Sequence, residues 1–355
     1  MEDLLPYVTP KLILKYFNLH PLNQTDFNKV PKGQKIPLTW PSVAEYFMTI
    51  PEKIRNKPEY SMKWHNGLLR MIQLLVNEGL LTPIGNASGF DQRYHGNGYA
   101  NPALIEYGYY DFLIFGFQLI REHFQDTVRP VIVNQGVLDK TESIGTGFTI
   151  WHDKKLYFVT ARHCLPPGDL VTIPMFVPPD EPLSPVNIFV PGNDQIDLAV
   201  IQTSDKVAIS DKYFLLSDPE SLDPVLTMGY PPIQGFTEPV QIAEIAAIAT
   251  TLKSTTGQIT GKGLHYAGGM TPHFLISARV KGGNSGGPVI NKYGLAVGMI
   301  IESLQNEHSP DLLGYGLALS SQVIKDLLSS ISRKGGTVGF CELPFKANSK
   351  GFVVC

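Results

Sequence analysis

From about Arg129 onward, the sequence is broken into short runs of β-forming residues separated by glycine and proline turns. The first six runs are VIVNQGVL, GTGFTIW, KLYFVTA, LVTIPMF, PVNIFV and DLAVIQ. The second six are VLTMGY, VQIAEIAAIAT, GQITGKGLHY, HFLISARV, GLAVGMII and GYGLAL. No helical periodicity lies between these runs. Roughly six and six strands in ~200 residues predict two six-stranded antiparallel β-barrels, an all-β architecture.

One helix is predicted to close this β-rich region. Apolar residues at three- and four-residue spacing between Ser320 and Ser329 favour a helix after the last strand. Residues 333–355 contain two cysteines and the pair Gly335–Gly336, and they show no assignable pattern. We therefore place a β-domain at residues 129–332 and expect a mobile C-terminal tail at 333–355.

Residues 1–128 have a different pattern and predict a mainly helical N-terminal domain of unknown role. Val43–Met48 and Leu68–Leu81 have helical spacing, and a Gly/Asn-rich stretch at 85–102 is typical of a long loop. Tyr107–Phe124 is aromatic and apolar, and its pattern fits a helix or a strand. A helix, a loop and an aromatic ribbon would also fit a winged-helix unit. Basic and acidic residues are nearly balanced here, so a helical packing or adaptor domain is favoured.

Composition excludes several classes of protein. A formal net charge of −3 argues against a protein built mainly to hold nucleic acid. Three cysteines, Cys164, Cys341 and Cys355, are too few for a disulfide framework and show no metal-ligand spacing, so no metal or cofactor is expected. No apolar run reaches the ~18 residues of a membrane span, and no signal peptide is recognisable. These features favour a soluble protein in the reducing cytoplasm.

The most informative motif is KGGNSGGPV at residues 281–289, where four glycines flank Ser285. Glycine permits close backbone approach and unusual angles, which a serine nucleophile needs around an exposed hydroxyl. The backbone N–H groups of Gly283 and Ser285 would form an oxyanion hole. The same sequence could also be a simple glycine-rich turn between strands.

Two further motifs supply a base and a carboxylate. His163 follows a β-run in VTARHCL, and histidine is the natural base for a serine nucleophile. Asp197 lies inside the apolar run IDLAVIQ, where a carboxylate is costly unless it is paired. A histidine N–H is a suitable partner and would fix the imidazole tautomer. Asp194 is a competing candidate, but it lies in the polar turn PGNDQ.

Together these motifs resemble the chymotrypsin-like (trypsin-like) serine protease family. The matching stretches are GTGF, VTARHCL, IDLAVIQ, GYP, GNSGGPV, AVGMI and GYGLALSSQVIKDLL, between about Arg129 and Ser332. The pattern is most similar to the bacterial-type branch of HtrA-like and V8-like peptidases. The resemblance does not extend to residues 1–128 or to the tail.

The resemblance implies a role for each matched residue. Ser285 would attack the scissile carbonyl, His163 would act as general base and then acid, and Asp197 would orient the imidazole. Gly283 and Ser285 would supply the oxyanion donors. In this family the first substrate pocket is lined by residues before the serine and by the strand after it. The corresponding candidates are Arg279, Val280, Met299, Ile300 and Ile301.

The expected activity is therefore that of a serine endopeptidase acting on proteins or peptides through an acyl-enzyme. One alternative is a catalytically silent protease fold that only binds. Another is a sensor whose N-terminal domain binds a regulatory partner or nucleic acid and controls the protease. Asn284 stands where zymogen-activated relatives have an aspartate that pairs with a freed N-terminal ammonium. We therefore expect a different mechanism to fix the conformation of the oxyanion loop: local hydrogen bonds of Asn284, or contacts from the N-terminal segment or an oligomeric partner.

Overall fold

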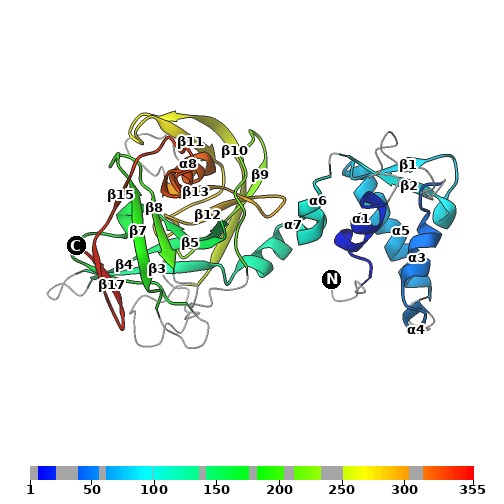
Figure 1. Cartoon of the computed structure of the whole chain (residues 1–355), viewed down its shortest axis with the longest axis horizontal. Helices are drawn as coiled ribbons and strands as arrows, with labels where there is room; N and C mark the ends of the chain where they lie inside the picture. The colour runs from blue at the N-terminus through cyan, green and yellow to red at the C-terminus, as the bar shows by residue number, and fades with distance from the viewer. Residues whose placement is uncertain are drawn as a thin grey trace. The chain divides into compact units, whose positions relative to one another are not determined.

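The computed structural model describes residues 7–20, 39–55, 61–98, 100–135, 141–175, 182–203, 212–232, 251–303 and 315–355. The chain divides into two compact units, Met1–Gly116 and Phe117–Cys355 (Figure 1). No helix among the described residues is long and apolar enough to cross a membrane.

The first unit is mainly helical, as predicted. Its elements are α1 (Pro10–Asn18), α3 (Val43–Thr49), α4 (Glu52–Arg55), α5 (Ser61–Asn77), β1 (Leu81–Ile84), the 3₁₀ turn η3 (Gly89–Asp91), β2 (Arg93–Gly96) and α6 (Pro102–Tyr107). Helix α3 begins in a capping box, in which Ser42 and Glu45 each bond the other's backbone N–H. Helix α1 begins with Thr9 as N-cap and proline in its first turn. Ile13, Leu14 and Phe17 from α1 and Leu68, Ile72 and Leu75 from α5 are buried in the unit's core.

Three details of this unit differ from the sequence expectations. Helix α5 begins at Ser61 and ends at Asn77, and the apolar residues after it form β1 instead of a further turn. The Gly/Asn-rich stretch contains β2, which pairs with β1 in an antiparallel ribbon. Tyr109–Phe124 is a helix, α7, interrupted at Gly116 by a left-handed φ of 75°. The winged-helix alternative took the aromatic stretch as its ribbon, and that stretch is helical; the ribbon that is present, β1–β2, comes from other residues.

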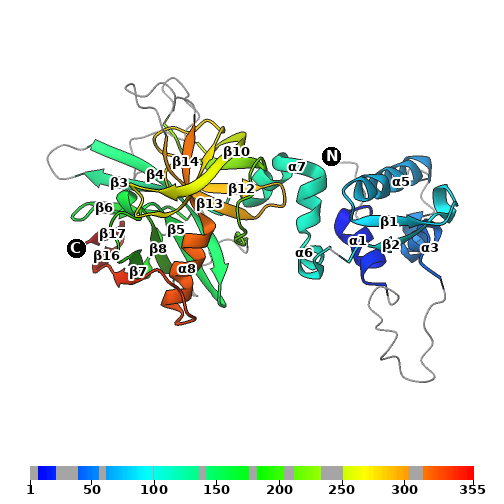
Figure 2. The same cartoon turned by 90° about the horizontal axis from the view of Figure 1, so that it is seen from above.

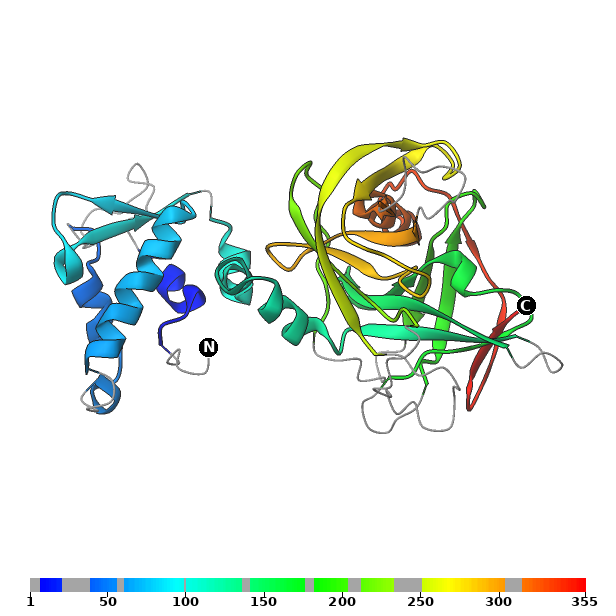
Figure 3. The same ribbon diagram turned by 180° about the vertical axis from the view of Figure 1, so that it is seen from behind.

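The second half of the β-region is a closed six-stranded barrel, as predicted (Figure 3). Its strands are β9 (Pro224–Gly229), β10 (Lys253–His265), β11 (Thr271–Ile276), β12 (Pro288–Asn291), β13 (Ala296–Ser303) and β14 (Gly316–Ser320). They close in the order β10-β11-β14-β13-β12-β9. Val225, Phe274, Val289, Val297 and Ile300 are among the buried residues that fill the barrel. The predicted run VQIAEIAAIAT lies outside the described residues, whereas the short buried strand β12 had not been predicted.

The first half also contains six strands, but they belong to an open nine-stranded sheet. Its own strands are β3 (Val128–Gln135), β4 (Thr141–His152), β5 (Lys155–Thr160), β6 (Leu170–Thr172), β7 (Pro185–Pro191) and β8 (Ala199–Thr203). The other three are β15 (Phe340–Glu342), β16 (Phe345–Asn348) and β17 (Gly351–Val354). The order is β15-β7-β8-β5-β4-β3-β6-β17-β16, so tail strands extend both edges (Figures 1 and 2).

The expectation of a mobile tail was therefore wrong. Strand β17 pairs with β6, and Phe352 is fully buried. Strand β15 pairs with β7 through Cys341 and Val190. The predicted closing helix is present as α8 (Ser321–Ile331), which begins at the N-cap Ser320 and packs against β11, β13 and β14.

Candidate active site

His163 and Asp197 are brought together by two paired strands. Strand β5 ends at Thr160 and leads into the 3₁₀ turn η4 (Arg162–Cys164), which carries His163. Asp197 precedes β8, which pairs with β5 so that Ala199 lies opposite Thr160. The two side chains therefore emerge at the same end of the sheet.

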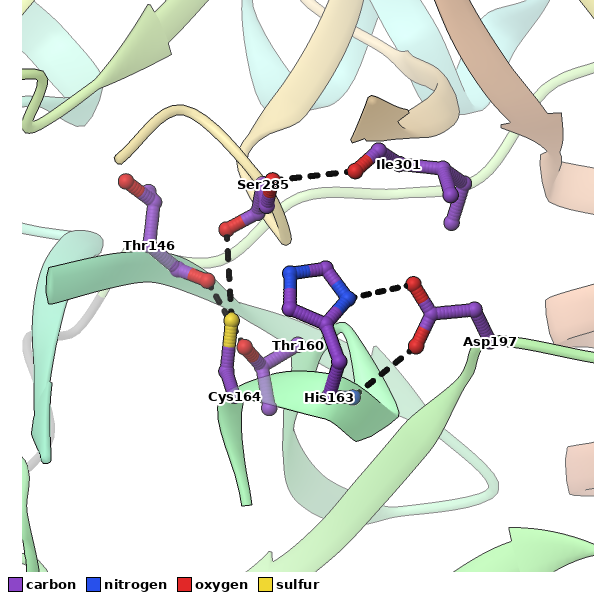
Figure 4. A network of polar contacts seen from close by, with 7 residues as sticks. All are labelled: Thr146, Thr160, His163, Cys164, Asp197, Ser285 and Ile301. Atoms are coloured by element: carbon purple, nitrogen blue, oxygen red, sulfur yellow. Dashed lines mark hydrogen bonds and ion pairs between the residues drawn. The ribbon is translucent and has the colours of Figure 1, made fainter. Parts of the chain in front are cut away.

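The two side chains form a bidentate arrangement (Figure 4). The imidazole Nδ1 lies 2.6 Å from Asp197 Oδ2, and the backbone N–H of His163 donates to Asp197 Oδ1 at 2.9 Å. Asp194, the competing candidate, is exposed in the preceding turn. An acceptor at Nδ1 favours the tautomer that carries its proton there, which leaves Nε2 free to accept a proton.

Electrostatics around His163 favour its charged form. The hydrogen bond to the Asp197 carboxylate raises the pKa of the imidazole above its ordinary value. The neighbouring Cys164 thiol adds to the rise, while burial opposes it. The imidazole is thus a stronger base than a free histidine, and more of it is protonated near neutral pH.

Ser285 lies on the other side of the imidazole, as Figure 4 shows. Its hydroxyl donates to the Ile301 carbonyl at 2.9 Å, and no hydrogen bond joins it to His163 among the described residues. Catalytic hydrogen bonds are often long or absent before substrate binds. To bond His163, the Ser285 hydroxyl would have to leave the Ile301 carbonyl.

The backbone around Ser285 requires glycine at two positions. Gly283 and Gly286 have left-handed φ angles of 92° and 83°. A Cβ at Gly283 would lie 2.6 Å from the Tyr230 carbonyl oxygen, and one at Gly286 would lie 2.0 Å from that of Thr146. The backbone N–H groups of Gly283 and Ser285 donate to no residue that the structure describes. Both remain available to a developing oxyanion.

Thr146 is a positioning residue that the sequence analysis missed. Its buried hydroxyl donates to the Gly283 carbonyl at 2.6 Å and accepts from the Tyr230 N–H at 3.0 Å. Its own N–H donates to the Ser285 carbonyl at 2.8 Å. Thr160 donates in turn to the Thr146 carbonyl at 2.7 Å. The only signal for it in the sequence is the motif GTGF, in which the threonine stands between two glycines.

Cys164 also lies against the nucleophile loop. Its buried thiol is 3.8 Å from the Ser285 carbonyl oxygen, whereas Cys341 and Cys355 are exposed. All three cysteines are free.

The substrate-pocket candidates divide into two groups. Val280, Met299 and Ile300 are buried, with Val280 and Ile300 in the core of the closed barrel. Arg279 is exposed, and Ile301 is half-buried with its carbonyl bonded to Ser285. Only Arg279 and Ile301 of the five thus present substantial surface to a ligand in this conformation.

Comparison with known families agrees with this geometry. Residues 145–299 match the family model described as "Trypsin-like peptidase domain". This part of the chain is a trypsin-like peptidase domain. The matched segment includes His163, Asp197 and Ser285. The match does not single out an HtrA-like or V8-like branch of the trypsin-like family.

Solved structures similar to the chain include two of the protease Rv3671c, both in an inactive form. The first, a mutant from M. tuberculosis H37Rv, has 18% sequence identity and a TM-score of 0.42, and the match covers 60% of this chain and 90% of that one. The second has 19% identity and a TM-score of 0.40, with coverage of 60% and 92%. No curated protein matches the sequence.

Proposed function

We propose that this trypsin-like peptidase domain is a serine endopeptidase that cleaves peptide bonds through an acyl-enzyme. The observation that carries the proposal is the Asp197–His163 pair, bonded at 2.6 Å and adjacent to Ser285. Ser285 would attack the substrate carbonyl after His163 Nε2 takes its proton. The resulting imidazolium, stabilised by Asp197, would then protonate the leaving amine. The free N–H groups of Gly283 and Ser285 would stabilise the tetrahedral oxyanion.

The substrate would be a protein or peptide, and no metal or cofactor enters this chemistry. The three free thiols favour a reducing compartment, and we place the enzyme in the cytoplasm.

The test is labelling by a fluorophosphonate probe together with cleavage of a peptide library by the full chain. The wild type should be labelled and should cleave peptides, while Ser285→Ala should do neither. Ser221→Ala, in an exposed turn, is the matched control and should behave as wild type. Peptide cleavage that persists in a well-folded Ser285→Ala variant would refute the proposal.

One observation favours the catalytically silent alternative. The Ser285 hydroxyl donates to Ile301, not to His163, so the nucleophile is not engaged with its base. The same probe separates the two functions, because a silent fold would remain unlabelled even with peptide present.

The sensor alternative, in which the first unit binds a partner or nucleic acid, is tested separately. Retention of residues 1–116 on immobilised DNA at low salt, compared with an uncharged matrix, tests whether that unit binds nucleic acid.

A further inference from the structure

A small pocket lies beside the nucleophile loop of the peptidase domain. Its lining includes Arg279, one of the substrate-pocket candidates, but none of His163, Asp197 and Ser285. Its volume is about 170 Å³, several times the ~30 Å³ that a water molecule occupies in the liquid. It is lined by Thr227, Pro231, Lys253, Thr255, Arg279, Lys281 and Asn284. Among the lining residues that the structure describes, three are cationic and none is acidic. Lys253 already has another interaction, so Arg279 and Lys281 are the two cations that favour a negatively charged occupant.

Two of the cations lie on either side of a residue of the barrel core. Val280 is buried in the barrel core, and a Cβ on Gly316 would come within 2.7 Å of its side chain. Arg279 and Lys281, on either side of Val280, are both exposed, so neither side chain is buried in that core. The Thr255 hydroxyl anchors the segment by donating to the Arg279 carbonyl at 2.9 Å. Neither Arg279 nor Lys281 forms an ion pair with a residue that the structure describes.

Asn284 gives a second and independent indication of a ligand. The residue is only 6% exposed, yet its side-chain amide forms no hydrogen bond within the described part of the chain. The sequence-based expectation of local hydrogen bonds therefore holds only for its backbone, which donates to Lys281 and accepts from Gly287. The side chain lines the cationic pocket, where its amide is open to solvent and can bond water or a ligand.

We propose that this pocket binds a small oxyanion, with a phosphate group as the best match. Arg279 can offer a planar fork of donors, Lys281 adds charge, and the Asn284 amide can donate a neutral hydrogen bond. An ammonium group would be repelled by the same lining.

The site also offers a means of regulation, and this part rests on the proposed peptidase function. Asn284 joins Gly283 to Ser285, the two residues whose N–H groups form the oxyanion hole. An anion bonded to the Asn284 side chain restrains the backbone between these donors. Phosphate should therefore raise the peptidase kcat by fixing the loop in its competent form.

Binding can be tested without catalysis, by titrating the full-length Ser285→Ala protein with inorganic phosphate in a calorimeter. O-phospho-L-serine and acetate serve as parallel titrants, and sodium chloride holds the ionic strength constant. Saturable phosphate binding is expected. Phosphoserine binding as well would show that the pocket admits a phosphate carried on another group, while tighter binding of acetate would overturn the choice of phosphate.

Variants locate the site. Arg279→Gln with Lys281→Gln should weaken phosphate binding by about tenfold or more, because two charge-assisted contacts are lost. Lys346→Gln, an exposed cation on β16, should leave it unchanged. Asn284→Asp should abolish binding, since it places a carboxylate of nearly the same shape against the cations. Absence of saturable binding, or equal binding by the double variant, would overturn the proposal.

The activity measurement separates the two proposals. In the wild type, phosphate should raise kcat with the half-saturation found by calorimetry, and Asn284→Asp should not respond. If phosphate binds but kcat does not change, the proposed regulation is wrong and the proposed phosphate site stands. If the wild-type chain binds phosphate but cleaves no peptide, the proposed peptidase function is wrong and the proposed phosphate site stands.

Discussion

The Thr146 hydroxyl donates to the Gly283 carbonyl at 2.6 Å, joining residues 137 positions apart in the sequence. Through this contact the open sheet that carries His163 holds the loop that carries Ser285. The two halves of the site are thus fixed to each other by a buried hydrogen bond next to the reacting atoms.

Removing that hydroxyl should weaken both stability and activity. Thr146→Val leaves the Gly283 carbonyl and the Tyr230 N–H without their partner, at a cost of ~1–3 kcal/mol in the free energy of unfolding. The value of kcat should fall more than KM rises, because the oxyanion loop is loosened. Thr149→Val is the matched control, since Thr149 is equally buried on β4 and its hydroxyl has no partner among the described residues. Urea denaturation and steady-state kinetics measure both effects, and equal losses in the two variants would contradict the assigned role.

The raised pKa of His163 predicts an alkaline activity profile. Catalysis needs the neutral imidazole, so kcat/KM should rise with pH through a midpoint above the ordinary 6.5. Asp197→Asn removes the main cause of the shift, so the midpoint should move down while the rate falls by ~10⁴-fold. A midpoint that stays in place in Asp197→Asn would show that the carboxylate is not what raises the pKa of His163.

Folding stability should respond to pH in the opposite sense. Because the pKa of His163 is higher in the folded than in the unfolded state, the protonated pair stabilises the fold. That contribution is fully present below about pH 6.5 and is lost as the pH rises through the folded-state value. Urea titrations of wild type and His163→Ala across this range should converge toward high pH. If the difference in unfolding free energy between the two proteins does not change with pH, protonation of His163 does not contribute to stability.

The three thiols should react at two different rates. Cys341 and Cys355 are exposed, whereas Cys164 is buried against the Ser285 carbonyl. A disulfide reagent should therefore modify two cysteines rapidly and the third slowly, with loss of peptidase activity following only the slow phase. The double variant Cys341→Ser, Cys355→Ser should keep the slow phase alone. Inactivation in the fast phase would contradict this assignment.

Phe352 should contribute strongly to stability although it belongs to the tail. Its side chain is fully buried, so Phe352→Ala should cost ~3–5 kcal/mol in the free energy of unfolding. Phe340→Ala removes a ring that is 39% exposed and should cost much less. Chemical denaturation of the two variants makes the comparison, and similar losses would mean that β17 does not pack as described.

The local sequence was sufficient to predict which residues form the candidate site. It was not sufficient to predict the residues and strands that hold them in place. His163, Asp197 and Ser285 each lie in a short motif whose chemistry is visible without knowledge of the fold. The role of Thr146 depends on a partner 137 positions away. Nothing in the neighbouring sequence distinguishes this threonine from any other threonine in a strand. The tail strands were missed for the same reason, since all three residues of β15 are exposed and β17 is defined by pairing with β6. Conversely, helix α8 was predicted because its apolar face repeats within a few residues.

The two-sided attachment of the tail has a consequence for synthesis of the chain on the ribosome. Strands β6 and β7 acquire their outer neighbours only from residues 340–354, which are translated about 150 residues or more later. Both edge strands of the sheet that carries His163 therefore stay unpaired while the whole closed barrel is translated. A nascent chain stalled after α8 would hold the complete set of His163, Asp197 and Ser285 yet expose two unpaired edges, which makes it a natural client for chaperones.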